Sequence, residues 1–199
     1  MKGKQSDSFM QTSQPDKPEA GQEVTDSFII EKFCGDSPHY AFNLLVRKYQ
    51  KRVYALVRKM VIDHDDADDL TQDVFIKVWN NLDKFRADSQ LFTWIYRIAS
   101  NECLSFLRKK RSRFFLPIHD ISHELENKLD DTPYFSGDEI AKKLQKALLK
   151  LPDKQRIVFT MKYFEEMSYA QMSEILGTSI GALKASYHHA VKKIEEQLQ

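Results

Sequence analysis

Six aspartates crowd one short segment of this 199-residue chain, residues 63–73. Paired carboxylates can hold a metal ion or act as general acid and base, so a carboxylate-based metal hydrolase is one interpretation. No His, Cys or Ser of matching spacing joins them, which makes that interpretation weak. On a helix, part of this segment forms a polar stripe beside an apolar one, and such a stripe could dock on a basic protein surface. The stripe comprises Asp66, Asp69, Asp73, Lys77 and Asn80.

Two other groups of residues could bind a metal or form a cross-link. His119 and His123 precede Glu124 and superficially suggest zinc, but no convincing third ligand follows and the HExxH order is absent. Cys34 and Cys103 are far apart and lie in helical patterns, so neither a CxxC site nor a disulfide framework is indicated. We therefore predict no metal site, no cofactor and two buried, reduced thiols.

A dense group of cations occupies residues 108–113, where five of six side chains are Lys or Arg. Aromatic residues lie upstream in the same predicted helix, and basic charge beside aromatic surface suits contact with a DNA backbone and stacking on bases. Two or three cations would complement the dipole of a helix C-terminus, so five favour a polyanionic partner. Of the aromatic residues, Trp94 is assigned mainly to the core.

The last predicted helix, residues 179–197, has two distinct faces at about 100° per residue. One face could present hydrogen-bonding groups to base edges and cations to phosphates, as a recognition helix does, although an ordinary solvated face has the same pattern. This polar arc contains Lys184, Ala185, His188, His189 and Lys192. The apolar arc contains Ile180, Leu183, Tyr187, Ala190, Val191, Ile194 and Leu198.

Helices must position all of these residues. Gly is scarce, and no alternating strand pattern competes with the 3.6-residue period, so we predict an all-α fold. The first block contains four predicted helices: one over about 25–34, one after Pro38, one after the Asp-rich turn at 63–66 and one from Asp88 or Ser89. The Asp side chains of that turn can cap the free N–H groups of the third helix. The second block has a helix after the Ser136–Glu139 capping box and another over 153–164. A Ser168–Gln171 capping box opens a short helix, and this helix, a glycine turn and the final helix then outline a helix-turn-helix.

The two blocks are predicted to be small helical domains, residues 24–112 and 138–199, joined by a flexible linker. Pro and Gly break the helical period in that linker, residues 113–137. Residues 1–23 have hardly any large apolar side chains, so we predict a disordered tail. The net charge of +1 is too small to drive DNA binding in bulk. No apolar run approaches the ~18 residues that span a bilayer, and we expect a cytoplasmic protein without membrane insertion.

Several segments resemble regions of the extracytoplasmic-function (ECF) sigma factors, group IV of the sigma-70 family of RNA polymerase subunits. Residues 66–79, DADDLTQDVFIKVW, resemble region 2.2, and residues 85–102, FRADSQLFTWIYRIASNE, resemble regions 2.3 and 2.4. Residues 151–156, LPDKQR, residues 168–177, SYAQMSEILG, and the final helix resemble region 4.2. Two motif sets in the right order, split by a linker of suitable length, are far more specific than either set alone.

The resemblance implies a non-enzymatic initiation factor that binds core RNA polymerase, recognises the minus-10 and minus-35 promoter elements and promotes DNA melting. It assigns contact with the beta-prime clamp helices to Asp66, Asp69, Gln72, Asp73, Lys77 and Asn80. It assigns minus-10 contacts to Arg86, Asp88, Ser89, Phe92, Arg97, Asn101, Arg108 and Lys109. It assigns minus-35 contacts to Ser179, Gly181, Ala182, Lys184, Ala185, His188, His189 and Lys192.

The family also implies contact with the polymerase beta flap and regulation by an anti-sigma factor. One departure concerns the recognition helix, where Lys184 is followed by Ala185 and Ser186 instead of a second early cation. Fewer cations imply weaker phosphate contact or a different minus-35 sequence, and His188 and His189 allow protonation-dependent binding. The alternative is a helix-turn-helix regulator whose first block is a sensor or dimerisation domain, and which binds duplex promoter DNA without polymerase.

Overall fold

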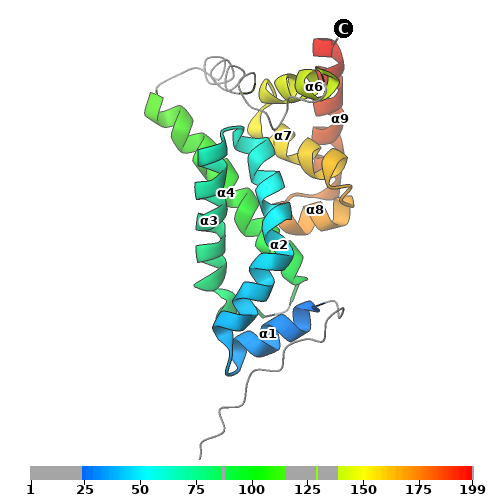
Figure 1. Ribbon diagram of the computed structural model, residues 1–199. Helices are drawn as coiled ribbons and strands as arrows, with labels where there is room; N and C mark the ends of the chain where they lie inside the picture. Colours follow the sequence, from blue (N-terminus) through cyan, green and yellow to red (C-terminus); the bar gives the residue numbers. More distant parts are fainter. Residues whose placement is uncertain (1–23, 87, 115–128, 130–138, 199) are drawn as a thin grey trace, which may run out of the picture.

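The computed structural model describes residues 24–86, 88–114, 129 and 139–198, and every regular element in these ranges is a helix (Figure 1). The all-α prediction is therefore confirmed for the described residues. The helices form two groups that lie against each other. The predicted N-terminal tail, most of the predicted linker, Ser136 and the segment from His119 to Glu124 lie outside the described residues.

The first group contains the four predicted helices. They are α1 (Asp26–Cys34), α2 (Pro38–Val61), α3 (His64–Trp79) and α4 (Leu91–Phe114), with a short 3-10 turn, η1 (Leu82–Lys84), before α4. The Asp-rich turn caps α3 as expected, because the Asp63 carboxylate accepts a hydrogen bond of 3.0 Å from the Asp66 N–H. Asp65 and Asp66 also lie in the first turn, where the helix dipole favours negative charge.

Apolar side chains three and four residues apart turn α2, α3 and α4 toward one core. Each of these large side chains contributes about 1.5–3 kcal/mol when fully buried. From α2 the core receives Leu45, Tyr49, Val53, Leu56, Val57 and Met60. From α3 and α4 it receives Leu70, Val74, Val78, Leu91, Ile95, Ala99, Cys103 and Leu107.

The second group follows the predicted order. Its elements are α6 (Glu139–Leu149), α7 (Asp153–Phe159), a π-helical turn η3 (Thr160–Phe164), α8 (Tyr169–Leu176) and α9 (Ile180–Leu198). The helix expected over 153–164 is present, but its last turn is π-helical. In the core between α6, α7 and α9, the Phe159 ring stacks on Tyr163 and Tyr187 with centroids 5.1 and 5.6 Å apart.

The helix-turn-helix has the local signals that were predicted for it. The Ser168 hydroxyl accepts a hydrogen bond from the Gln171 N–H, and the Gln171 side chain accepts one from the Ser168 N–H, which completes a capping box. Gly177 ends α8 at φ 61°, a left-handed conformation that favours glycine over other residues. The chain therefore turns sharply into α9.

The two groups pack directly on each other, which the sequence did not predict. α8 and α7 lie along α4, and η3 contacts α2. Apolar side chains of the second group join the core cluster of the first, among them Met161, Met167, Met172 and Ile175. The structure is thus a closed form in which α4 is shared between both groups.

The two thiols differ in their surroundings. Cys103 is completely buried in α4, and burial raises the pKa of its thiol to about 12. Cys34 is exposed, so the prediction of two buried thiols is wrong for this residue. The reason is that α1 is short and ends at Cys34, and only Ile29 of this helix is fully buried.

Candidate nucleic-acid interface

The polar arc of α9 faces solvent, as predicted. Its exposed residues are Lys184, Ala185, His188, His189 and Lys192. The opposite side, packed on α6, α7 and α8, buries Leu183, Ala190 and Ile194. Two members of the predicted apolar arc are instead exposed, Ile180 to 43% and Leu198 to 50%, because they lie at the two ends of the helix. The middle of α9 therefore offers one continuous outward surface.

Small residues occupy the start of α9. The Ser179 hydroxyl accepts a hydrogen bond of 3.3 Å from the Ala182 N–H, so this side chain caps the helix. Gly181 and Ala182 are exposed, and a helix N-terminus of this kind favours an anion. The Lys184 ammonium lies 5.9 Å from the centre of the Tyr169 ring, which directs it toward α8.

The eight residues assigned to minus-10 contacts do not share one environment. Arg97, Asn101, Arg108 and Lys109 are exposed along α4, and Arg86 and Asp88 are exposed in the segment before it. Ser89 and Phe92 are half-buried. The Arg97 guanidinium donates a hydrogen bond of 2.7 Å to the Glu174 carbonyl oxygen in α8. Part of the predicted DNA surface is therefore in contact with the second group.

Asn101 lies in an open cavity of about 350 Å³ between α3, η1 and α4. The cavity is lined by Lys77, Asn81, Lys84, Trp94, Ile98, Asn101 and Glu102. Trp94 is half-buried and lines this cavity, so its assignment mainly to the core was incomplete. An indole beside an amide and a lysine can stack on a base and hydrogen-bond to it. The spacing of seven residues from Trp94 to Asn101, two helical turns, was the signal that could have found this pair.

Some cations at the C-terminal end of α4 pair with carboxylates of the protein, and others are exposed to solvent. Lys110 pairs with Asp66 of α3 at 2.9 Å, and Arg111 pairs with Asp153 of α7. Arg108 and Lys109 remain exposed. Two of the five cations in residues 108–113, Lys110 and Arg111, are thus paired with carboxylates in this structure, and the interpretation of the cluster as a surface for a polyanion stays a prediction. The tertiary structure brings carboxylates that are distant in the sequence to these two cations.

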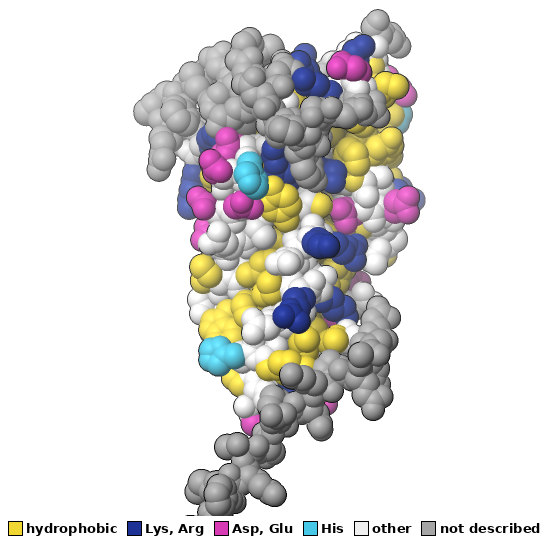
Figure 2. All heavy atoms as spheres, viewed as in Figure 1, with side chains coloured by type: hydrophobic (Ala, Val, Ile, Leu, Met, Phe, Trp, Pro, Cys, Tyr) yellow, Lys and Arg dark blue, Asp and Glu magenta, His cyan; other side chains and the backbone are white. Residues whose placement is uncertain are grey.

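The acidic stripe of α3 is open. Asp69, Gln72, Asp73, Lys77 and Asn80 are exposed, whereas Asp66 is half-buried beside Lys110. Lys77 forms an ion pair with Glu102 of α4. Figure 2 shows acidic side chains gathered over the first half of α3, and basic side chains along the neighbouring α2. No group of three or more metal-binding side chains occurs among the described residues.

The contact between α4 and α7 contains a buried charge that sequence reasoning missed. Arg156 is 2% exposed, and its guanidinium lies 3.4 Å from the Asp153 carboxylate, which also pairs with Arg111. The Arg156 Nε makes no hydrogen bond. Burial lowers the pKa of this guanidinium. Because a desolvated arginine with incomplete hydrogen bonding is costly, this contact is less stable than an apolar one of the same size.

No helix in the described part of the chain is both long enough and apolar enough to cross a bilayer.

Solved structures confirm the fold. The structure of CnrH in complex with the cytosolic domain of CnrY is similar with a TM-score of 0.64 and 24% identity, over 87% of this chain and 96% of that one. The sigma factor RpoE from Bartonella quintana, in complex with the anti-sigma factor NepR, is similar with a TM-score of 0.62 and 25% identity, over 79% and 96% of the two chains.

Sequence comparisons give the family. Residues 45–113 match sigma-70 region 2, and residues 136–194 match sigma-70 region 4. The chain is 30% identical to the ECF sigma factor SigW of Bacillus subtilis, over 80% of this chain and 89% of SigW. It is also 30% identical to the ECF sigma-E factor of Escherichia coli K12, over 89% and 96% of the two chains. This chain, with the outward arc of α9 and the shared helix α4, therefore belongs to the ECF sigma factors of the sigma-70 family. These proteins are the promoter-recognition subunits of bacterial RNA polymerase.

Proposed function

We propose that the two helix groups divide promoter recognition between them. In this proposal the outer face of α3 binds the beta-prime clamp helices, α4 and the segment before it bind the minus-10 strand, and α9 reads the minus-35 element beside the beta flap. The observation that carries the proposal is that α3 and α9 expose their polar stripes on separate surfaces of one chain. Each partner can therefore be held without blocking the other.

The cavity beside Trp94 is proposed to hold an unstacked base of the minus-10 element. Taking a base out of the stack costs a few kcal/mol, and stacking on the aromatic wall of this open cavity recovers part of that cost. Asn101 would hydrogen-bond to the base, and Lys84 would neutralise a nearby phosphate. Arg86, Asp88 and Ser89 lie in the segment that leads into the same part of α4.

Simultaneous contact with both promoter elements requires the two groups to separate. The names of the elements place them about 25 base pairs apart, which is about 85 Å of duplex at ~3.4 Å per base pair. In the closed form α8 contacts both α4 and α9, far too close for that span. Residues 115–138 lie between α4 and α6, and a fully extended segment of that length reaches roughly 80 Å. We propose that the closed form opens on polymerase.

Partners and location follow the family. An anti-sigma factor is a proposed partner because the solved neighbour RpoE is in complex with one, NepR. The chain is proposed to act in the cytoplasm, where polymerase and promoter DNA are, and to have no catalytic activity of its own.

Reconstituted initiation tests the proposal. Purified protein is mixed with core RNA polymerase and a library of promoter fragments from the native genome, and transcript 5′ ends are mapped. We expect specific start sites that depend on the added chain. The helix-turn-helix regulator would instead protect duplex promoter DNA from nuclease without polymerase. Absence of any chain-dependent start site across the library would contradict the proposal.

A further inference from the structure

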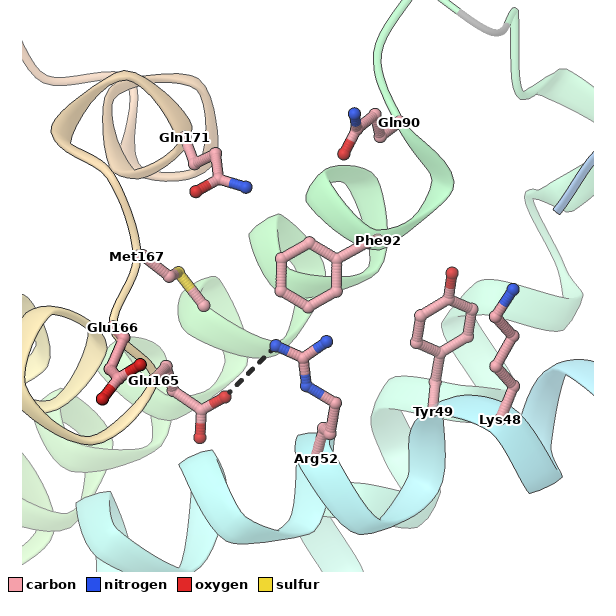
Figure 3. Close-up of a pocket in the computed structure, with 9 residues that line it drawn as sticks. All are labelled: Lys48, Tyr49, Arg52, Gln90, Phe92, Glu165, Glu166, Met167 and Gln171. Carbon is pink, nitrogen blue, oxygen red and sulfur yellow. Dashed lines mark ion pairs between the residues drawn. The ribbon is translucent and has the colours of Figure 1, made fainter. Parts of the chain in front are cut away.

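A cavity of about 620 Å³ lies where the second helix group meets α2 and the start of α4 (Figure 3). Its walls come from both groups, with cations and aromatic rings on one side and carboxylates on the other. The first group contributes Lys48, Tyr49, Arg52, Gln90 and Phe92. The second group contributes Glu165, Glu166, Met167 and Gln171. Apart from Phe92 and Gln90, none of these residues belongs to the surfaces proposed above.

One carboxylate bridges the two groups inside this cavity. Glu165 Oε2, just after η3, lies 3.5 Å from the Arg52 guanidinium of α2. The same oxygen accepts a hydrogen bond of 3.2 Å from the hydroxyl of Tyr96 in α4. An anionic oxygen held by one guanidinium and one phenol is the arrangement that a phosphate oxygen takes when a protein binds a nucleic-acid backbone.

The Arg52 guanidinium rests on an aromatic platform. Its central carbon lies 4.4 Å from the centre of the Phe92 ring and 5.8 Å from that of Tyr96. The Phe92 and Tyr96 ring centres are 4.2 Å apart, and the Tyr49 ring centre lies 6.4 Å from that of Phe92. Tyr49 and Tyr96 are buried, 4% and 0% exposed, so the rings of Phe92 and Tyr96 hold the guanidinium in place by cation–π contact, and the half-exposed Arg52 supplies the positive charge that a DNA backbone attracts.

The ion pair is unequally exposed. The Arg52 side chain is 51% exposed, whereas the Glu165 side chain is 10% exposed. A half-exposed pair contributes little stability, while the carboxylate has given up most of its water on closure. When an incoming phosphate replaces Glu165 beside Arg52, little attraction to the guanidinium is therefore lost, and the Glu165 carboxylate returns to solvent.

Besides the Arg111–Asp153 ion pair described above, three further contacts between the groups involve a side chain of one group and a carbonyl or a ring of the other. The Gln145 side chain donates a hydrogen bond of 3.0 Å to the Lys59 carbonyl oxygen, and the Lys59 ammonium lies 4.9 Å from the Phe164 ring. Arg97 donates to the Glu174 carbonyl oxygen as described above. Each of these contacts joins a side chain of one group to a carbonyl or a ring of the other, and water can replace them on opening.

We propose that Arg52, Phe92 and Tyr96 form a further site for a phosphate of single-stranded promoter DNA, and that Glu165 occupies this site in the closed form as an internal competitor. The inference rests on the proposed function, because it assumes that α4 faces the melted strand. Binding of a single strand here and closure of the second group would then exclude each other.

The test uses the full chain without polymerase and a labelled oligothymidylate of about 12 nucleotides, the scale of a single-strand binding site. Binding is followed by fluorescence anisotropy at several salt concentrations. We expect Glu165→Gln to tighten binding roughly three- to tenfold, the range of one net hydrogen-bonded contact. The slope of log K against log salt should steepen by about 0.7, the value for one extra phosphate on a single strand. Adding Arg52→Gln to Glu165→Gln should remove both gains.

Glu166→Gln is the matched control, because Glu166 lines the same cavity and carries the same charge but forms no ion pair with Arg52 among the described contacts. Equal tightening by Glu165→Gln and Glu166→Gln would overturn the proposal, as would tightening that survives Arg52→Gln. Glu165→Asp, which keeps the charge on a shorter side chain, should give an intermediate affinity, and thermal melts check that each variant folds. Initiation by the wild-type chain with core polymerase tests the proposed function separately.

Discussion

The outer arc of α9 and the side of α4 that faces α8 carry similar residues, yet only one of them is free in the closed form. Lys184, His188 and Lys192 of α9 are exposed. On α4, Arg97 donates to the Glu174 carbonyl oxygen and the Tyr96 hydroxyl donates to the Glu165 carboxylate, both in the second group. Residue type therefore predicts which surfaces suit DNA, whereas the packing of the second group decides which of them is available.

The largest predicted effect is a difference in alkylation rate between the exposed thiol of Cys34 and the buried thiol of Cys103. With its pKa at about 12, the Cys103 thiol is ~10⁻⁴ ionised at pH 8, compared with roughly a quarter for an ordinary cysteine. We expect Cys34 to be alkylated rapidly at pH 8 and Cys103 at least about a thousandfold more slowly. Peptide mass spectrometry after timed alkylation measures both rates. Comparable rates would show that Cys103 is not buried in solution.

The buried Cys103 thiol also makes the stability of the folded protein depend on pH. Between about pH 8.5 and the folded pKa of about 12, the unfolded chain loses the thiol proton while the folded protein keeps it. The contribution of the buried thiol is thus complete below about pH 8.5 and falls as pH rises. Denaturant unfolding of wild type and Cys103→Ala at pH 7.5 and 9.5 should show a smaller wild-type advantage at the higher pH. An unchanged difference would contradict the assignment.

The open arc of α9 gives the next largest effect. Lys184→Ala should reduce open-complex formation on promoters with an intact minus-35 element by roughly 5- to 150-fold, which corresponds to about 1–3 kcal/mol for a base contact. Lys193→Ala is the control, because Lys193 lies on the same helix but donates to Gln155 of α7. An equal loss on promoters whose minus-35 element is scrambled would show that Lys184 does not read that element.

The acidic stripe of α3 should show an intermediate effect on polymerase. We expect Asp69→Ala with Asp73→Ala to weaken binding to core polymerase roughly tenfold, or about 1.4 kcal/mol, because two exposed charges are removed from the proposed interface. Competition for core polymerase against the wild-type chain measures the change. Glu195→Ala with Glu196→Ala removes the same charge from exposed positions on α9 and should leave the affinity unchanged. Equal weakening by both pairs would indicate a general charge effect.

The smallest effect concerns the cap that orients α8 against α4. Ser168→Ala removes the hydrogen bond to the Gln171 N–H and should cost about 1 kcal/mol of stability. For a chain of this length the melting temperature should fall by about 2–4 °C. Ser173→Ala, a half-buried serine inside α8, is the control for loss of a hydroxyl on the same helix. A fall no greater than that of the control would mean that the cap does not stabilise the closed form.

Local signals predicted the elements closely. The Asp63 cap, the Ser168–Gln171 capping box and the left-handed Gly177 are short-range features, and each lies where the sequence placed it. The same methods failed where a partner comes from a distant part of the chain. Asp66 and Asp153 neutralise Lys110 and Arg111, and no local pattern reveals that a cation will meet a carboxylate on another helix.

The sequence by itself determined the helices, their caps and the polar arc of α9, because capping and the 3.6-residue period depend on neighbours within four positions along the chain. Only the tertiary structure decided that the two groups close on α4, that Trp94 and Asn101 share a cavity, and that Glu165 holds Arg52 and Tyr96. These contacts join residues far apart in sequence, and their stability depends on burial and on charge partners that exist only once the helices have packed.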